Sequence, residues 1–515
     1  MTTKRVLLVL SVLVLGLVIV SSVAVVRLGP RLRGQVVRTL ESRMEAAVTL
    51  DVFEAHLWPR PGVSGGGLTI RHRARADLPP LVTIRHFSGD ASWRGIFFLQ
   101  LGQVTLDGLE VTIPPRRRHD MPALVPSDTS DGEEGDPSRF AIATLTATNA
   151  RLSILPRDPA KDPRVFDIFS LEIHDFTLLT PSRFTASLTN PVPEGRIETS
   201  GSFGPWNRDE PSGTPVDGQF QFDADLGTIK GIAGALHATG EFGGPVDRIG
   251  VTGTTRTPDF RVPKLKAHAL PLATTFKAIV DGTNGDVQLD PVDARLGASR
   301  FLAKGFVVGT KGVKGKRVLL DVTATDARME DVLQLTVRTA TPPMSGALTL
   351  TTSFDLPQGE ADVIDKLRLG GTVAIADARF ASDAIQGKVD ELSRRARGRP
   401  DDGAAVDVPS TVRTSFTMAD GTVRLSGLSY TVNGATIDLS GRYALESGAL
   451  DFSGVVRLDA SMSDTQIGFR HFLLKPFDGL FRKRGAGTRL AIRIAGTVEQ
   501  PKIALDLGRT LKGKN

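Results

Sequence analysis

The sequence contains no cysteine, and this absence excludes several kinds of site. Without a thiol among its 515 residues, the chain forms no disulfide bond, no thiolate metal centre and no cysteine nucleophile. The eight histidines are spread from His56 to His471, and none belongs to an H-E-x-x-H motif or another paired spacing typical of a metal site. We therefore expect neither a metal ion nor a cofactor.

The sequence also has little excess of either charge. It carries 63 basic and 57 acidic residues, and the net charge of +6 is scattered along the chain. Nucleic-acid-binding proteins usually concentrate their basic residues in a patch or along one helix. We therefore expect no nucleic-acid partner.

Only one long apolar run is present. Residues 6–26 contain no charged residue, and as a helix they would cover about 30 Å, enough to cross a bilayer. This predicts a transmembrane anchor at 6–26 after a short tail at 1–5. Ser22-Val23-Ala24 also fits a signal-peptidase site, but the run exceeds the roughly 7–15 apolar residues of a signal peptide, which favours retention. Basic residues flank both ends of the run, so charge alone does not orient it.

A helical period follows the predicted anchor. Apolar residues recur every four positions with arginines between them, at Leu28, Leu32, Val36, Leu40 and Met44. This spacing predicts an amphipathic connecting helix over residues 27–47. Such a helix either lies along a membrane surface or packs on the first strands, and packing is the commoner arrangement.

From Val48 onward the apolar period changes to two, as in the segment from Val104 to Leu106. This alternation is typical of half-buried antiparallel strands and predicts a mainly β body. We divide that body into an N-terminal β segment at 48–115, a middle β segment at 140–285 and a C-terminal β region at 286–515. Residues 116–139 lack an apolar period and are rich in Pro, Gly and acidic residues, which predicts a flexible linker.

Two helices and one hairpin are predicted inside the body. Pro271 and Gly282 are placed to begin and end a helix over residues 270–281, and this interruption divides the chain near residue 285. Residues 383–397 carry one apolar face and are followed by Gly398 and Pro400, which predicts a second helix. Asn433-Gly434 separates two alternating segments, which is a strong signal for a β-hairpin.

A sheet with one apolar face must cover that face. A second sheet would cover it and give a sandwich, whereas a long curved sheet would leave an apolar gutter that could take an acyl chain. The alternation alone does not choose between these arrangements. Ordinary core packing is the commoner meaning of such a pattern for any single residue.

Motifs for catalysis are weak. Gly62-Val63-Ser64-Gly65-Gly66 matches G-x-S-x-G, but it lies between prolines and a strand-like segment, so we expect a glycine turn rather than a nucleophile elbow. Gly309–Arg317 resembles a phosphate loop only in composition and predicts a flexible basic turn. A carboxylate pair for glycoside hydrolysis stays open, because spacing alone does not reject one among many acidic residues.

Both ends of the chain resemble the AsmA-like family. The resemblance rests on the single N-terminal anchor, on Leu57-Trp58-Pro59-Arg60-Pro61-Gly62 and above all on the segments Gly441–Phe452, Leu473–Asp478, Gly487-Thr488, Ile494–Thr497 and Pro501–Leu507. It implies a bacterial inner-membrane protein with one membrane span and its body in the periplasm. It also implies a long curved antiparallel sheet that forms an elongated apolar groove with a few short helices, similar to bridge-like lipid-transfer proteins.

The function that this resemblance implies is not enzymatic, because the family has no known catalytic residues. We expect a protein that binds or conducts phospholipid acyl chains along its groove and supports lipid transport between the inner and outer membranes. The partners implied are the inner membrane, phospholipid and an outer-membrane or envelope protein. The alternative is an outer-membrane assembly or tethering factor that conducts no lipid.

Candidate site residues come from the C-terminal region. The alternating segments there predict a groove lining of Leu428, Tyr430, Val432, Ile437, Leu439, Leu450, Phe452, Ile492 and Ile494. A second set follows a helical spacing beside basic residues and predicts contact with a membrane surface, at Phe469, Leu473, Phe477 and Leu480. The alternative for the second set is a helix that covers the exposed end of the sheet, and this explanation is favoured.

Overall fold

The computed structural model describes residues 33–42, 46–56, 61–72, 78–92, 100–115, 141–156, 158–177, 179–207, 210–396, 408–458 and 489–505. No helix within these residues is long and apolar enough to cross a membrane. The predicted anchor at 6–26 and the predicted linker at 116–139 lie outside the described residues.

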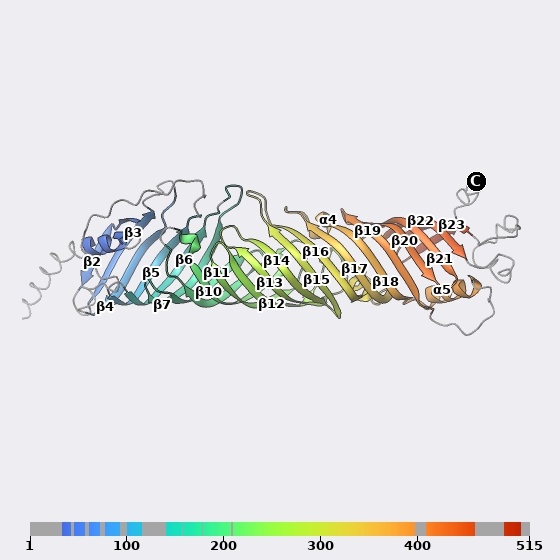
Figure 1. Ribbon diagram of the computed structural model, residues 1–515, viewed down its shortest axis with the longest axis horizontal. Coiled ribbons are helices and arrows are strands. Elements are labelled where there is room, and N and C mark those ends of the chain that lie inside the picture. Colours follow the sequence, from blue (N-terminus) through green and yellow to red (C-terminus); the bar gives the residue numbers. More distant parts are fainter. Residues whose placement is uncertain are drawn as a thin grey trace, which may run out of the picture.

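The described residues form one elongated, curled sheet of 24 strands (Figure 1). Strands up to β12 are β1 (Ala46–Thr49), β2 (Val52–His56), β3 (Gly62–His72), β4 (Val82–Ala91), β5 (Gln100–Ile113), β6 (Ala141–Ile154), β7 (Arg164–Phe176), β8 (Ser182–Pro191), β9 (Glu194–Phe203), β10 (Pro215–Asp225), β11 (Ala235–Pro245) and β12 (Ile249–Phe260). The remaining strands are β13 (Leu270–Asp281), β14 (Asp286–Leu296), β15 (Ser299–Val308), β16 (Arg317–Arg328), β17 (Met344–Leu356), β18 (Arg368–Phe380), β19 (Ser410–Ala419), β20 (Thr422–Val432), β21 (Ala435–Ala444), β22 (Ala449–Leu458), β23 (Arg489–Thr497) and β24 (Pro501–Leu505).

The topology is a meander with one interruption. From β6 to β24 each strand pairs antiparallel with the next, whereas β5 and β6 pair in parallel. At one end, β1 and β2 both pair with β3. With about 4.8 Å between neighbouring strands, a sheet of this size is about 115 Å long. The prediction of a mainly β, long, curved sheet is confirmed, with this parallel pair as the departure from an antiparallel sheet.

The two faces of the sheet differ in chemistry. Residues that lie opposite each other on paired strands share a face, and one such row across β9 to β13 is Thr199, Phe220, Gly240, Gly253 and Phe276. The adjacent row points the other way and consists of Glu198, Gln221, Thr239, Thr254 and Thr275. We call the first side the apolar face and the second the polar face.

Glycine spacing shows that the sheet curls toward the apolar face. Within β9 to β22, a side chain added at the apolar-face glycines would lie closer than 3.0 Å to a carbonyl oxygen of a neighbouring strand, at Gly195, Gly201, Gly218, Gly240, Gly253, Gly305, Gly371, Gly441 and Gly454. At the polar-face glycines Gly243, Gly250 and Gly370 the nearest atoms are 3.8, 3.4 and 3.5 Å away. Crowding on one side marks the concave side of a bent sheet, where glycine permits close approach.

The predicted helix at 270–281 is wrong, because this segment is strand β13. Its residues pair with β12 on one side and β14 on the other, and Phe276 lies opposite both Gly253 and Val292. Pro271 is tolerated near the start of the strand, where few ladder hydrogen bonds are lost. The sheet is continuous on both sides of residue 285. The division of the chain near this residue therefore stays a prediction.

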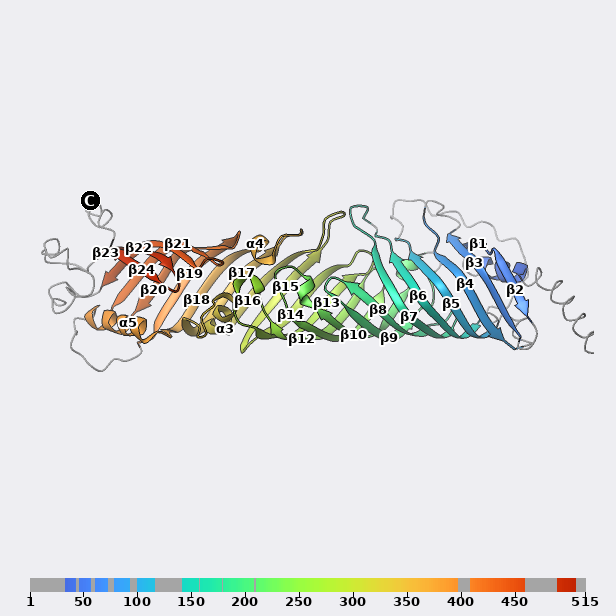
Figure 2. The same ribbon diagram turned by 180° about the vertical axis from the view of Figure 1, so that it is seen from behind.

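Short helices lie along the long sides of the sheet. Helix α3 (Met329–Thr336) and helix α5 (Asp383–Ala396) follow one side, and helix α4 (Val363–Lys366) follows the other (Figure 2). Helix α5 and the Asn433-Gly434 hairpin between β20 and β21 confirm two sequence predictions. A helix over residues 33–42 packs Leu40 against Val48 and Ile70, and it ends before β1 begins at Ala46. It therefore packs on the first strands, and the last two residues of the predicted range 27–47 belong to β1 instead.

Candidate functional site: an apolar groove with joined rims

The predicted lining residues all lie on the apolar face. Tyr430 is opposite Ile437, and Leu428 is opposite Leu439. The remaining members follow in the same register, with Val432 opposite Ala435, Leu450 opposite Tyr443, Ile492 opposite Gly454 and Ile494 opposite Phe452. The structure thus brings together on one side of β20 to β23 a set that the sequence had selected by alternation.

Burial divides this set. Tyr430, Val432, Phe452 and Ile492 are no more than 9 % exposed, and all but Phe452 belong to one packed cluster with Val389 of α5. The other members, Leu428, Ile437, Leu439, Leu450 and Ile494, are half-buried. Much of the predicted lining is therefore packed as core at this end of the sheet. The predicted membrane-surface residues Phe469, Leu473, Phe477 and Leu480 lie outside the described residues.

An accessible lining lies in the middle of the sheet, where sequence analysis had named no residue. The two large clusters of buried residues occupy β4 to β7 and β16 to β23, on either side of the middle strands. Between them the large apolar-face side chains are half-buried, and they include Ile197, Phe220, Phe222, Phe242, Val251 and Phe276. The strict alternation of β10, exposed on one face and half-buried on the other, was the signal that could have identified them.

Aromatic rings in this middle part lie over glycines of the neighbouring strand. A side chain added at Gly240 would lie 2.8 Å from the ring of Phe220, and one added at Gly218 would lie 2.9 Å from the ring of Phe242. Phe276 covers Gly253 in the same way. A ring that rests on a glycine covers backbone instead of projecting outward, as in the aromatic rescue of strand glycines. These rings therefore make the concave face apolar by covering its backbone.

The sheet has two long rims, named here by the connections that form them. The first rim carries the β6–β7, β10–β11 and β12–β13 connections together with α3 and α5. The second rim carries the β13–β14, β15–β16 and β21–β22 connections together with α4. Because the strands run diagonally to the long axis (Figure 1), each rim winds along the molecule.

The rims touch where the β6–β7 connection meets the β13–β14 and β15–β16 connections. Lys161 Nζ lies 2.8 Å from Asp286 Oδ2, and the amide of Lys311 donates to the carbonyl of Ala160 at 2.7 Å. The amide of Gly312 donates to Asp162 Oδ2 at 3.1 Å. We call this contact the basic bridge.

Further rim contacts involve α4 and the β21–β22 turn. The amide of Val363 donates to the carbonyl of Lys230 at 3.1 Å. Lys264, the middle residue of the short helix η4 (Pro263–Leu265), places its Nζ 2.5 Å from Asp365 Oδ1 and 3.4 Å from Glu446 Oε2. Leu265 is 2 % exposed and packs with residues of the opposite rim, Ile364 and Leu445. Connections five to nine strands apart are thereby joined across the concave face.

Electrostatics hold the basic bridge together at neutral pH. Burial alone would raise the pKa of Asp286, but hydrogen bonds from Lys161, from the amide of Gly309 and from Lys316 outweigh it and hold that pKa below its usual range. The carboxylate of Asp286 is therefore ionised at neutral pH. Lys316 Nζ also donates to the carbonyl of Asn284 at 2.8 Å.

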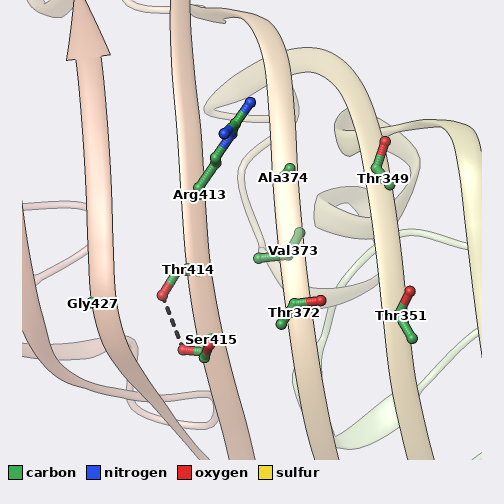
Figure 3. A pocket seen from close by; sticks show the side chains of 9 residues that line it. All are labelled: Thr349, Thr351, Thr372, Val373, Ala374, Arg413, Thr414, Ser415 and Gly427. Carbon is green, nitrogen blue, oxygen red and sulfur yellow. Dashed lines mark hydrogen bonds between the residues drawn. The ribbon is translucent and has the colours of Figure 1, made fainter.

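The polar face carries a shallow depression of a different character (Figure 3). Its lining consists of threonines, Ser415, small apolar residues and Arg413 from β17 to β20. Thr351, Thr372 and Ser415 lie opposite one another on successive strands. Hydroxyl rows of this kind pair across strands and cover a sheet surface. The depression offers one guanidinium and no carboxylate or imidazole, so we assign it no chemistry.

The remaining sequence motifs are placed as follows. Ser64 lies inside β3, so the predicted glycine turn at 62–66 is wrong, and Ser64 is paired with Ser88 of β4 instead of standing at a strand-to-helix elbow. Gly309–Arg317 forms the β15–β16 connection within the basic bridge. The described residues hold no group of three or more His, Asp or Glu side chains that could bind a metal ion.

Comparison of the chain with protein-family models, with curated proteins and with solved structures found no match.

Proposed function

We propose that this protein holds or conducts lipid acyl chains along its concave apolar face and supports phospholipid transport between two membranes. The observation that carries the proposal is the half-buried apolar lining of β9 to β15, on the concave side of a continuous sheet. An apolar surface that the protein itself covers only in part suits a binding site. A long concave surface of this kind fits an extended chain better than a compact ligand.

The energy available is sufficient for this role. Removing a CH₂ group from water is worth about 0.8 kcal/mol, so an acyl chain of about 16 carbons gains on the order of 10 kcal/mol when it lies on an apolar surface. A track that offers such contact throughout lowers the barrier to moving a lipid through water. No catalytic group is required for this activity.

The cellular setting belongs to the same proposal. The resemblance to the AsmA-like family and the apolar run at residues 6–26 support a place in the inner membrane of a bacterium, with the sheet in the periplasm. A length of about 115 Å for 24 strands supports a role that reaches outward from that membrane. An envelope protein at the far end would complete the path.

The first test is native mass spectrometry of the full chain, purified in a mild detergent from a diderm bacterium without added lipid. Several phospholipids bound per chain are expected if the lining is occupied along its length. One bound lipid would indicate a local pocket or a shuttle. A folded protein that carries none would contradict the proposal and favour the assembly or tethering role.

A matched pair of variants locates the bound lipid. Phe220→Asn changes the apolar face at a half-buried ring, whereas Phe306→Asn removes a ring that is 49 % exposed on the polar face. The first change is expected to lower the number of lipids retained, and the second to leave it unchanged. Equal retention in both, with native circular dichroism, would remove the apolar face from the proposal.

A further inference from the structure

One arginine lies on the apolar face beside the basic bridge. Arg164 is opposite Ile154 in the β6–β7 register, and Phe166 is opposite Leu152. The guanidinium carbon of Arg164 lies 5.0 Å from the centre of the Phe166 ring. A cation stacked on a groove-facing ring is therefore held on the apolar side of the sheet, near the first rim.

This arginine has a neutral partner and free hydrogen-bond capacity. Its Nη2 donates to Asn190 Oδ1 at 2.8 Å, and Asn190 is fixed in turn because its Nδ2 donates to the carbonyl of Pro193 at 2.8 Å. Asn190 is 8 % exposed. Among the described residues no carboxylate forms an ion pair with Arg164, and burial lowers the pKa of its guanidinium. A guanidinium has five N–H donors, so most of them remain for a ligand.

Two further cations meet Arg164 at the bridge. A side chain added at Gly285 would lie 3.6 Å from Arg164 Cδ and 3.6 Å from Lys316 Nζ, so the two residues flank the same glycine. Lys161 and Lys316 share one carboxylate, Asp286, at 2.8 and 3.2 Å. Two other carboxylates at the bridge, Asp162 and Asp281, accept hydrogen bonds from backbone amides, so of these three cations Arg164 is the one that lacks a carboxylate partner among the described residues.

A desolvated guanidinium without a counter-charge is costly, and a phosphate is the anion that its planar fork fits best. An oxygen-rich phosphate group would bind two N–H donors at once and would be attracted by the neighbouring lysines. The same position adjoins the half-buried apolar lining that begins at β9. The surroundings therefore suit a molecule that is anionic at one end and apolar along the rest.

We propose that Arg164, together with Lys161 and Lys316, binds the phosphate group of a phospholipid whose acyl chains lie on the apolar face. This inference rests on the proposed function, since it names the headgroup chemistry that the same groove would recognise. The site would select phospholipids over neutral lipids with identical acyl chains. It would also fix a lipid at one place along the groove.

The test compares two lipids that differ only in the phosphate-bearing headgroup. The full chain is incubated with vesicles that contain dioleoyl phosphatidylglycerol and dioleoylglycerol in equal amounts, repurified, and its bound lipids are measured by mass spectrometry. The wild-type chain is expected to retain about tenfold more phosphatidylglycerol than dioleoylglycerol. Arg164→Gln should bring this ratio close to one without lowering the amount of dioleoylglycerol retained.

Arg183→Gln is the matched control. Arg183 lies on the neighbouring strand β8, where its Nη2 is 2.7 Å from Asp175 Oδ2, and its side chain is 75 % exposed. This variant loses the same charge and should keep the wild-type ratio. If Arg164→Gln does not fold, Arg164→Lys replaces it, because it keeps the charge and loses the planar fork, and its ratio should fall below that of Arg183→Gln.

The possible outcomes separate the two proposals. Equal retention of both lipids by the wild type, or an unchanged ratio in the Arg164 variant, would overturn the headgroup site and leave the groove proposal standing. Failure to retain either lipid would overturn the groove proposal itself. Titration with inorganic phosphate in the absence of lipid distinguishes a free-phosphate site, since binding that depends on Arg164 without any lipid preference would contradict a headgroup role.

Discussion

At the scale of single residues, the crowding of the concave face decides which side chains the sheet tolerates. Gly240 and Gly243 lie in the same strand, β11, but on opposite faces. A side chain at Gly240 would meet the carbonyl oxygen of Thr252 and the ring of Phe220, whereas one at Gly243 would have its nearest neighbour at 3.8 Å. The curvature of the sheet therefore depends on glycines at the crowded positions of the concave face, where aromatic rings lie over them.

Alanine at these two positions provides the first prediction. Gly240→Ala should lower the free energy of unfolding by about 1–3 kcal/mol, because the added methyl group forces a backbone or ring shift. Gly243→Ala should be neutral or stabilising by about 0.5 kcal/mol, because it restricts the unfolded chain without a clash. Urea denaturation followed by circular dichroism measures both. Equal effects would show that the concave face is not crowded.

Leu265 provides a second prediction at this scale, because it is a fully buried side chain in a rim connection. Leu265→Ala should lower the free energy of unfolding by about 3 kcal/mol, since it opens a cavity between the rims. Leu302→Ala removes the same group from a position 44 % exposed on the polar face and should cost under about 1 kcal/mol. The urea midpoints of the two variants report the difference, and a small shift for both would mean that the rims separate in solution.

At the scale of elements, local pattern predicted strands and turns but not their partners. The Asn433-Gly434 hairpin and the helix from Asp383 were visible because each is specified by residues within a short window. The segment 270–281 was misread because proline and glycine at its ends outweighed a weak alternation, and its pairing with β12 and β14 depends on residues elsewhere. The basic bridge could not be predicted from local pattern, because Lys161 and Asp286 are 125 residues apart in the sequence.

The basic bridge predicts a dependence on pH. Because the pKa of Asp286 is lower in the folded chain than in an unfolded one, its contribution to stability is complete above the ordinary value of about 4 and is lost as pH falls through the folded value. Hydrogen-exchange protection of the Lys311 and Gly312 amides should fall in that acidic range. Asp286→Asn should reduce this protection above that range, where the wild-type carboxylate is ionised. Protection that is insensitive to both changes would contradict the bridge.

At the scale of the whole molecule, the joined rims decide where a ligand can reach the lining. The contacts at Lys161, Lys230 and Lys264 connect strands five to nine places apart across the concave side. Lipids would then load where the rims are apart, toward the ends of the sheet, and not sideways through the joined part. The apolar lining can be predicted from the alternation of the sequence. The restriction on where lipids would load cannot, because it depends on how the rims wind in three dimensions.

A covalent cross-link between the rims tests this restriction. Because the chain has no native cysteine, only the introduced thiols can react. Lys264→Cys with Asp365→Cys should be joined by a short bis-maleimide, because the two native side chains form an ion pair across the rims and both are partly exposed. Lys264→Cys with Leu302→Cys should not be cross-linked, since Leu302 faces the polar side. Lipid retention by the locked chain should match that of the unlocked chain. A marked loss would show that the rims must open for loading.

The meander has a consequence for the synthesis of the chain. From β6 onward every strand pairs with the one before it in the chain, so the sheet can grow one strand at a time as the polypeptide emerges, N-terminal end first, into the compartment where it folds. Each partial product ends in an unpaired edge that the next strand covers, which limits the time available for pairing with another chain. Each rim contact can form only after five to nine more strands have been added. The rims therefore join progressively along the molecule, behind the strands that are still being added.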